Sequence, residues 1–389
     1  MKNLLERDDL RVLFFGTYFQ FRGKETYISD EIDAVIKNYP NIKYVIYNVG
    51  PYYNVNRLVR YSKNVLWIQR GELKNLRVLI LFLKDMIKIF TKFKPHVIHS
   101  IYVIESFIMG IFGKIFRVPS ILHSRGMDIN FYPFVSIKSN ILARVTAKLN
   151  NIILTVSKVM KLDTYKLNIP HKKVIALYDG IDYSLFNPIN KKLNKKNEKL
   201  EILHVGQFNL VKKHDLMIEV CKELRDNRIN FHFTFTGYGF LEDHLKSLIE
   251  KYNLENWVCM AGYTDHDKIP EFLAKGDLYI QPSISEGMPI SVLEAMSMNL
   301  PVILTRVGGM PELIYDNGGI IIDVNNKKQL YDAILHYVNN PMKREADGIR
   351  NGKFVRDNFN WDRHAKVIYN IYLKLSKKRS RIIQINKTK

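Results

Sequence analysis

Cysteine is almost absent from this sequence. Cys221 and Cys259 are the only two among 389 residues, which excludes a disulfide framework. Both lie in apolar segments, so we expect two buried thiols in a protein that works in a reducing compartment.

Long hydrophobic runs are also missing. The longest uninterrupted apolar run is Val78 to Leu83, which is far too short to span a bilayer. The segment from Ile101 to Phe116 is interrupted by Glu105 and Lys114, and it therefore predicts a buried helix. The chain begins with charged residues of both signs and carries no signal-peptide pattern, so a cytoplasmic location is expected.

Acidic residues are the minority among the charged ones, 38 against 59 Lys and Arg, which gives a net charge of +21. Residues 1–190 hold 28 basic and 14 acidic side chains, a surplus of 14, and the remainder holds 31 and 24, a surplus of 7. The surplus indicates an anionic partner such as a nucleotide or an anionic membrane, or else a compositional bias towards Lys, Asn and Ile. No recognition motif accompanies the charge, so nucleic acid is not predicted as a partner.

One basic segment has helical periodicity. Residues 73–93 carry Lys84, Lys88 and Lys92 among apolar side chains that recur at helical spacing. A basic amphipathic helix either packs over a sheet or lies on an anionic membrane, and it can do both at once. One expectation is therefore peripheral contact of the protein with the inner face of the plasma membrane. High salt, or replacement of the three lysines by Gln, should then release the protein from the membrane.

Apolar strands and amphipathic helices alternate along the whole chain, which predicts an α/β protein with parallel sheets. The first strand ends at Gly16 and Thr17, but the three-glycine dinucleotide fingerprint is missing, so nothing favours NAD. A turn at residues 179–182 and a Lys- and Asn-rich run at residues 191–199 indicate a linker. We expect one domain over residues 1–185 and a second over residues 186–360.

The most informative stretch covers residues 278–313. An apolar strand leads into Glu286, and Glu294 follows eight positions later in a helix that begins after a proline. Backbone amides at such a helix start can hold ligand oxygens. A second strand leads into Gly308 and Gly309 before another helix start. Two open loops therefore meet at the carboxyl ends of neighbouring parallel strands.

This frame resembles the donor-binding core of family 4 glycosyltransferases, whose Glu-x7-Glu motif matches Glu286 and Glu294. The resemblance implies the GT-B architecture: two doubly wound Rossmann-like domains that face a cleft, with a helix in residues 361–389 crossing back to the first domain before a frayed basic tail. In that family the first Glu faces the donor sugar and the second bonds the ribose. A glycine pair, here Gly308 and Gly309, lets the diphosphate approach the backbone.

The resemblance implies further contacts to the nucleotide-sugar. The family pairs an Arg with a Lys five positions later to neutralise the diphosphate, but here Gln207 stands at the Arg position and Lys212 at the Lys position. One cation is therefore missing, unless Lys213, Arg306 or another cation compensates. We expect Lys212 and Glu286 to be catalytic, with Glu286 positioning sugar hydroxyls. The remaining expected donor-binding residues are Gly16, Gly206, Gly237, Gly262, Tyr263, Ser283, Gly287, Met288 and Pro289.

The loop from His123 to Asp128 departs from the family, whose members usually read His-Gly-x-Asp. This chain has Arg125 at that His position and His123 two residues earlier, and alternation in an extended segment puts both on one face. Both are candidate catalytic residues: Arg125 would bind a phosphate or a sugar acid, since it cannot relay protons. Alternatively, His123 is a satisfied strand-end residue. Asp128 and Thr17 are expected on the acceptor side, with Asp128 alternatively a helix cap.

The resemblance implies a retaining hexosyltransferase that moves a sugar from a UDP- or GDP-sugar to a hydroxyl of a saccharide or lipid-linked saccharide, in bacterial surface polysaccharide assembly. No metal-ligand set is visible in the sequence, so neither a metal nor another cofactor is expected, only the nucleotide-sugar as co-substrate. Gln207 and Arg125 favour a rival interpretation, a non-catalytic GT-B protein that binds sugar or a membrane surface within an assembly complex. A nucleotide-sugar epimerase of the same fold is a third.

Overall fold

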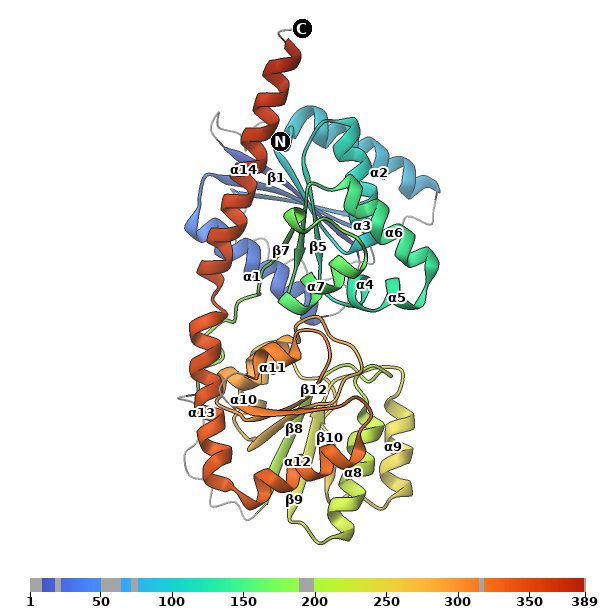
Figure 1. The fold of residues 1–389 in the computed structure, drawn as a ribbon, viewed down its shortest axis with the longest axis vertical. Coiled ribbons are helices and arrows are strands. Elements are labelled where there is room, and N and C mark those ends of the chain that lie inside the picture. The colour runs from blue at the N-terminus through green and yellow to red at the C-terminus, as the bar shows by residue number, and fades with distance from the viewer. Residues whose placement is uncertain are drawn as a thin grey trace. The chain divides into compact units, whose positions relative to one another are not determined.

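The computed structural model describes residues 9–17, 22–49, 64–70, 76–188, 199–314 and 318–387. The chain forms two compact units, the first from residues 1–180 and 361–389 and the second from residues 181–360 (Figure 1). The division falls between Gly180 and Ile181, whereas the sequence placed it between residues 185 and 186. Residues 361–389 are grouped with the first unit.

A seven-stranded parallel sheet forms the centre of the first unit, in the order β3-β2-β1-β4-β5-β6-β7. The order reverses between β1 and β4, which is the switch point of a doubly wound sheet. The edge strand β7 was not predicted, because a strand of three residues is too short to show alternation. The strands are β1 (Leu10–Thr17), β2 (Ile42–Val49), β3 (Val65–Arg70), β4 (Val97–Ile101), β5 (Ser120–Ser124), β6 (Ile152–Thr155) and β7 (Val174–Ala176).

Helices cover both faces of this sheet, and β1 shows why. Val12 and Phe14 point into a core shared with α1 and α14, while Leu13 and Phe15 point into a core shared with α2 and α3. Successive side chains of a strand face opposite ways, so one apolar strand supplies two cores. The helices are α1 (Arg22–Asn38), α2 (Leu76–Lys88), α3 (Val103–Ile115), α4 (Met127–Asn130), α5 (Tyr132–Val135), α6 (Ile137–Leu149), α7 (Lys158–Lys166), the 3-10 turn η4 (His171–Lys173) and α14 (Trp361–Lys387).

Two of the predicted helices end differently in the structure. The helix expected over residues 73–93 is α2 followed by a π-helical turn, η3 (Ile89–Phe93), and residues 73–75 lie outside the described residues. The expected frayed tail is wrong, because α14 continues as helix to Lys387. The tail is rich in Lys and Arg, which favour helix.

The second unit is built on a six-stranded parallel sheet in the order β10-β9-β8-β11-β12-β13. Its order reverses between β8 and β11, so the loops that follow these two strands open at one edge of the sheet. The strands are β8 (Leu200–Val205), β9 (Phe231–Thr236), β10 (Val258–Met260), β11 (Leu278–Gln281), β12 (Val302–Thr305) and β13 (Gly319–Ile322). The helices are α8 (His214–Asp226), α9 (Glu242–Lys251), η6 (His266–Lys268), α10 (Ile269–Leu273), α11 (Ile290–Ser297), η7 (Met310–Leu313), α12 (Lys327–Asn339) and α13 (Pro341–Asn358).

The two cysteines have different surroundings, so one of the two predictions is wrong. Cys221 on α8 is buried, as expected, but Cys259 on β10 is exposed. The reason is the strand order: β10 is an edge strand, and its central side chain points away from the core that holds Val258. Among the described residues, no helix is both long and apolar enough to cross a membrane.

Candidate functional site

Lys212 and Glu286 meet at the carboxyl edge of the second unit's sheet. Lys212 lies in the loop after β8, Glu286 in the loop after β11, and these strands are neighbours. Lys212 Nζ is 2.6 Å from Glu286 Oε1, which also accepts a hydrogen bond from Gln281 Nε2 at 2.9 Å. A cation suited to phosphate and a carboxylate suited to sugar hydroxyls are thus held together, both largely shielded from solvent.

Glu294 has a basic partner of its own. It lies on α11, almost completely buried, and its Oε1 is 2.7 Å from Nε2 of His266. His266 begins η6, in a loop that follows β10. The sequence did not single out His266 or Gln281, although each contacts one of the two predicted glutamates. No local pattern signals His266, because it lies 28 positions from Glu294.

The glycine pair packs directly against the Glu286 loop. Gly308 has a φ of +50°, and a Cβ there would lie 1.8 Å from the carbonyl oxygen of Glu286. Gly309 N donates to the Gly287 carbonyl at 2.7 Å. Only glycine fits such a conformation at such a distance. The following helix start is the single 3-10 turn η7.

Loops after β8, β9 and β10 also bring predicted positions together. Gly206 N donates to Thr236 O at 3.0 Å, and Gly237 N donates to Gly262 O at 2.9 Å. A Cβ on Gly237 would lie 1.9 Å from the Gly206 carbonyl oxygen. These three glycines, far apart in the sequence, therefore form one side of the same sheet edge.

The other predicted positions are divided between the units. In the second unit, Ser283 is buried and accepts from Gln281, Met288 is buried, Pro289 precedes α11, Gln207 follows β8, and Tyr263 is exposed. In the first unit, Gly16 and Thr17 end β1, and the Thr17 side chain lies outside the described residues. Asp128 lies on α4.

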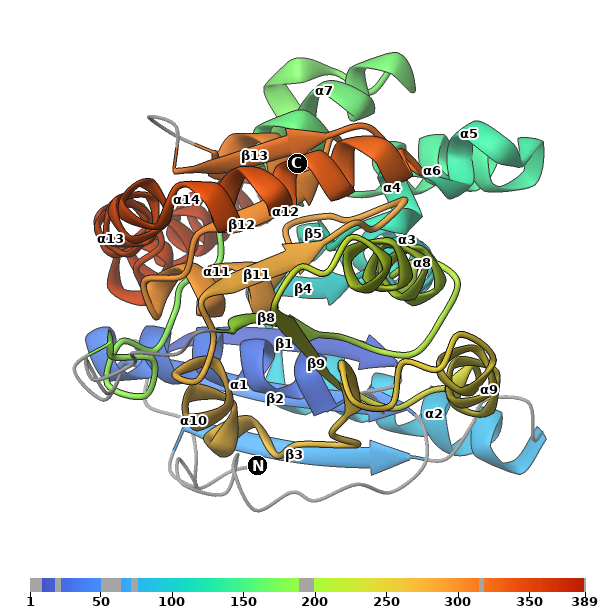
Figure 2. The same ribbon diagram turned by 90° about the horizontal axis from the view of Figure 1, so that it is seen from below.

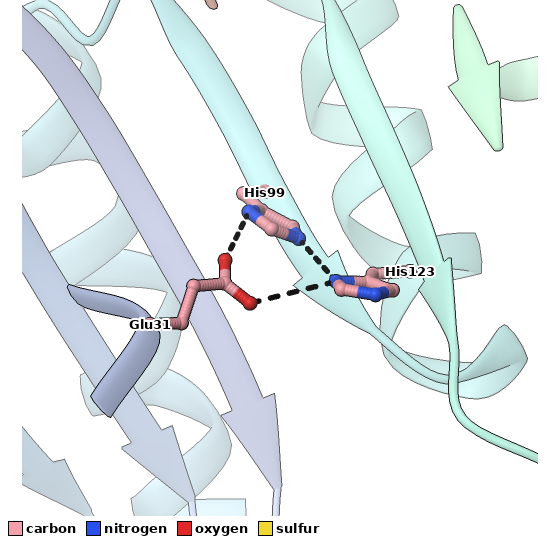
Figure 3. Close-up of side chains that lie close together, drawn as sticks. All are labelled: Glu31, His99 and His123. Atoms are coloured by element: carbon pink, nitrogen blue, oxygen red, sulfur yellow. Dashed lines mark hydrogen bonds and ion pairs between the residues drawn. The ribbon is translucent and has the colours of Figure 1, made fainter. Parts of the chain in front are cut away.

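The predicted loop residues His123 and Arg125 belong to a buried cluster inside the first unit. Glu31 of α1 lies beside His99 of β4 and His123 of β5, with Oε1 3.6 Å from His99 Nδ1 and Oε2 3.9 Å from His123 Nδ1 (Figure 3). The two imidazoles are 3.1 Å apart, His99 Nε2 to His123 Nδ1. Arg125 places Nη2 3.1 Å from Glu31 and Nη1 2.7 Å from Asp179.

The charges of this cluster follow from burial and from the ion pairs. Burial lowers the pKa of His99 to about 4, and burial together with Arg125 keeps the pKa of His123 well below its usual value. Burial would raise the pKa of Glu31, but His364, His99 and His123 outweigh it and lower that pKa. Burial would lower the pKa of His364, yet Glu31, 3.4 Å away, raises it. The Glu31 carboxylate is therefore ionised, although it and its partners are buried.

Two groups within the described residues bring three potential metal ligands within 4.8 Å of one another: Glu31 with His99 and His123, and Glu31 with Asp179 and His364. Arg125 already donates to both carboxylates. Because its guanidinium supplies the compensating positive charge, a metal ion would have to enter beside a fixed cation. The cluster is better explained as an internal ion-pair network joining α1, β4, β5 and α14.

The side chains of His123 and Arg125 thus contact other side chains within the first unit. The His123 side chain is fully buried, and Arg125 is 11% exposed. The alternation argument placed both on one face, and both do lie beside Glu31. His123 Nδ1 has His99 and Glu31 as partners, but its buried Nε2 has no hydrogen-bond partner among the described residues, so the alternative of a satisfied strand-end histidine is met at one nitrogen only. Neither side chain enters the proposed mechanism.

The profile of the family described as "Glycosyl transferases group 1" matches residues 186–387, just over half of the chain. The chain belongs to this family. It is 28% identical over 179 residues to the putative colanic acid biosynthesis glycosyltransferase WcaL of Escherichia coli (strain K12), and the match covers 44% of each chain. It is 29% identical over 286 residues to the uncharacterized glycosyltransferase MJ1178 of Methanocaldococcus jannaschii, 72% of this chain and 75% of that one.

Among solved structures, this group 1 glycosyltransferase chain is similar to Anabaena Alr3699/HepE in complex with UDP and glucose. The TM-score is 0.79 at 18% identity, over 94% of this chain and 100% of that chain. At this identity the likeness concerns the fold. The expected class, α/β with the two parallel-sheet domains of the GT-B type, is confirmed.

Glu294→Ala in this group 1 chain should weaken nucleotide-sugar binding about tenfold or more and reduce turnover without unfolding the protein. The carboxylate is held by His266 at a sheet edge where hydroxyls of a ribose would be bonded, and losing a charge-assisted hydrogen bond costs about 1.5–3 kcal/mol. Calorimetric titration measures the effect, with the nucleotide-sugar that raises the melting temperature of the parent protein most in a thermal-shift screen. An unchanged affinity would contradict the assignment.

A second prediction concerns pH and Asp128. Burial raises its pKa to about 6, although the Ser124 hydroxyl and the Gly126 N–H donate to Oδ1. Because the pKa of Asp128 is higher in the folded than in the unfolded protein, the protonated carboxyl favours the folded state. This contribution to the free energy of unfolding is fully present below about pH 4 and is lost as the pH rises through about 6. Relative to the parent, Asp128→Asn should therefore gain stability as pH rises from about 4 to 7, by at most about 3 kcal/mol. Urea unfolding across that range tests this, and a constant difference would refute it.

Proposed function

We propose that this group 1 glycosyltransferase moves a sugar from a UDP- or GDP-sugar to a hydroxyl of a saccharide or lipid-linked saccharide, with retention of configuration, in the assembly of a surface polysaccharide. The observation that carries the proposal is the 2.6 Å contact between Lys212 and Glu286 at one sheet edge. The name of the E. coli relative supports polysaccharide assembly, and the UDP and glucose in the Anabaena complex support a nucleotide-sugar as co-substrate.

In this mechanism the bond between the anomeric carbon and the diphosphate oxygen breaks, the acceptor hydroxyl oxygen forms the new bond to that carbon, and the hydroxyl proton passes to the departing diphosphate. Negative charge then grows on the diphosphate, so a fixed cation beside it lowers the barrier. Lys212 is that cation, and it turns from Glu286 to the phosphate when the nucleotide-sugar binds. Glu286, still held by Gln281, accepts hydrogen bonds from the sugar hydroxyls and orients the ring.

The nucleotide is held by the remaining contacts of the second unit. Glu294, oriented by His266, accepts from the ribose hydroxyls. The diphosphate approaches the backbone at Gly308, where no side chain intervenes. Gln207 adds a hydrogen-bond donor without charge, and the mechanism requires neither a metal ion nor another cofactor.

The test is a screen of nucleotide-sugars by thermal shift, followed by product analysis with the stabilising compound and saccharide or lipid-linked acceptors. We expect one nucleotide-sugar to raise the melting temperature and to yield a glycosylated product of retained configuration. Turnover in excess EDTA should be unchanged. Activity lost in EDTA and restored by magnesium or manganese would refute the metal-free mechanism. Binding without product for any acceptor would favour the non-catalytic alternative.

We also propose that the protein works at the inner face of the plasma membrane. The support is the basic surplus of residues 1–190 and the exposure of Lys84, Lys88 and Lys92 on and after α2. Contact of cations with anionic headgroups would bring the enzyme to a lipid-linked acceptor.

A further inference from the structure

Exposed apolar side chains gather on one part of the first unit. Of the 21 large hydrophobic side chains that are exposed among the described residues, 14 lie on α2, α3, α5 and α6. The described part of the second unit exposes six. The 14 are Leu79, Ile80, Leu81, Leu83, Ile87, Ile104, Ile111, Ile115, Tyr132, Phe134, Val135, Ile137, Ile141 and Val145. Such a concentration marks an interaction surface rather than the usual scatter.

These helices form one continuous layer. The ring of Phe90, in η3 after α2, stacks on Phe116 at the end of α3, with centroids 4.4 Å apart. On the other side of α3, a Cβ on Gly110 would lie 2.8 Å from Cβ of Leu149 on α6. Figures 1 and 2 both show α3 between α2 and α6 on the same side of the sheet. We call the outward surface of α2, α3, α5 and α6 the lipid face.

The exposed side of α6 carries an apolar stripe with cations beside it. Ile137, Ile141 and Val145 are spaced by four residues and therefore line one side of the helix, while Ala143 and Ala147 are buried on the other. Ile137 is 81% exposed and Ile141 57% exposed. The exposed cations beside this stripe are Lys138, Arg144 and Lys148.

The charge of the face has one sign. Its exposed cations also include Lys84, Lys88 and Lys114, and Lys92 is exposed on η3 directly after α2. The acidic residues in the described parts of these helices are Asp85 and Glu105, and neither is exposed: Asp85 accepts from the Tyr47 hydroxyl at 3.0 Å, and Glu105 is buried. Two copies of this face would bring like charges together, whereas an anionic surface complements it.

We propose that the lipid face docks the first unit onto an anionic lipid bilayer. Exposed Ile, Leu and aromatic side chains enter the boundary between headgroups and acyl chains, while Lys and Arg meet the anionic headgroups. The inference rests on the proposed function only for its peripheral position at a membrane. It goes further than the sequence did, because it adds three helices and an apolar contribution to the basic residues of α2.

The apolar contribution is tested with a matched pair of variants. Ile137→Ser/Ile141→Ser removes two exposed apolar side chains from the face, and Met342→Ser/Ile349→Ser removes two on α13 with exposures of 86% and 53%. In flotation at physiological salt, the parent should bind vesicles of phosphatidylglycerol and phosphatidylcholine but not of phosphatidylcholine alone. The α6 variant should bind at least tenfold more weakly, and the α13 variant like the parent.

The charge contribution is tested with Lys84→Gln/Lys88→Gln/Lys92→Gln. Binding should fall roughly a hundredfold, as it should for the parent at high salt, because each cation near an anionic surface contributes about fivefold. All variants should keep the parent's melting temperature and its sugar transfer to a soluble acceptor.

Three results would overturn the proposal. The first is a parent that does not bind anionic vesicles, and the second is an α6 variant that binds like the parent. The third is a parent dimer by light scattering that the α6 variant abolishes while vesicle binding persists, because the face would then join two copies. The first result would also contradict the proposed location at the membrane. None of them bears on sugar transfer, which is measured without vesicles, so failure of this inference and failure of the proposed reaction are separable.

Discussion

Replacing Lys212 with Ala should lower the rate of sugar transfer by about 10²- to 10³-fold. Lys212 is the cation that lies 2.6 Å from Glu286, and Gln207 occupies the position where the family has a second one. Removing a preorganised group that stabilises growing transition-state charge has an effect of this size. Initial rates with saturating nucleotide-sugar measure it, and thermal unfolding verifies that the variant remains folded.

The matched control is Lys246→Ala. Lys246 also pairs with a glutamate, at 2.9 Å from Glu242, but it lies on the exposed surface of α9. Its loss removes only an exposed surface ion pair, so the rate of sugar transfer should be unchanged. Equal rates for the two variants would mean that Lys212 is a structural ion-pair partner and not part of the catalytic machinery.

Gly308→Ala should disrupt the same site through the backbone. The added Cβ would lie 1.8 Å from the Glu286 carbonyl oxygen, and the φ of +50° is unfavourable for alanine. The Glu286 loop or the glycine loop must therefore shift, which should cost the second unit at least about 2 kcal/mol and abolish most nucleotide-sugar binding. Urea unfolding and calorimetric titration give the two quantities.

A comparison with Gly262→Ala separates the cost of a left-handed backbone conformation from the cost of a steric clash. Gly262 has a comparable φ of +69°, but a Cβ there would meet nothing within 4 Å. Its cost should be limited to the left-handed backbone, roughly 1 kcal/mol. If Gly308→Ala is no worse than Gly262→Ala, the two loops are less closely packed than the structure has them.

Elements with strong local patterns could be predicted, and those without could not. The strand Leu200–Val205 and the helix Pro341–Asn358 have the predicted bounds. The strand is an apolar run after a polar linker, and a proline in the first turn marks the start of the helix. The helices α5, α6 and α9 and the short strand β7 were not predicted. Few apolar positions define α9, and β7 has only three residues. Cys259 was assigned to the core because a sequence does not reveal that its strand lies at a sheet edge.

The sequence by itself determined the fold class, the family and the frame that carries Glu286, Glu294 and the glycine pair, because these depend on periodicity and on spacing within short stretches. Only the tertiary structure decided which side chains become partners. His266 reaches Glu294 across 28 positions, and Arg125 is committed to Glu31 and Asp179 across 94 and 54 positions. Likewise, only the packed helices show which apolar residues stay exposed on the lipid face. Contacts between distant segments depend on strand order and helix packing, which no local pattern encodes.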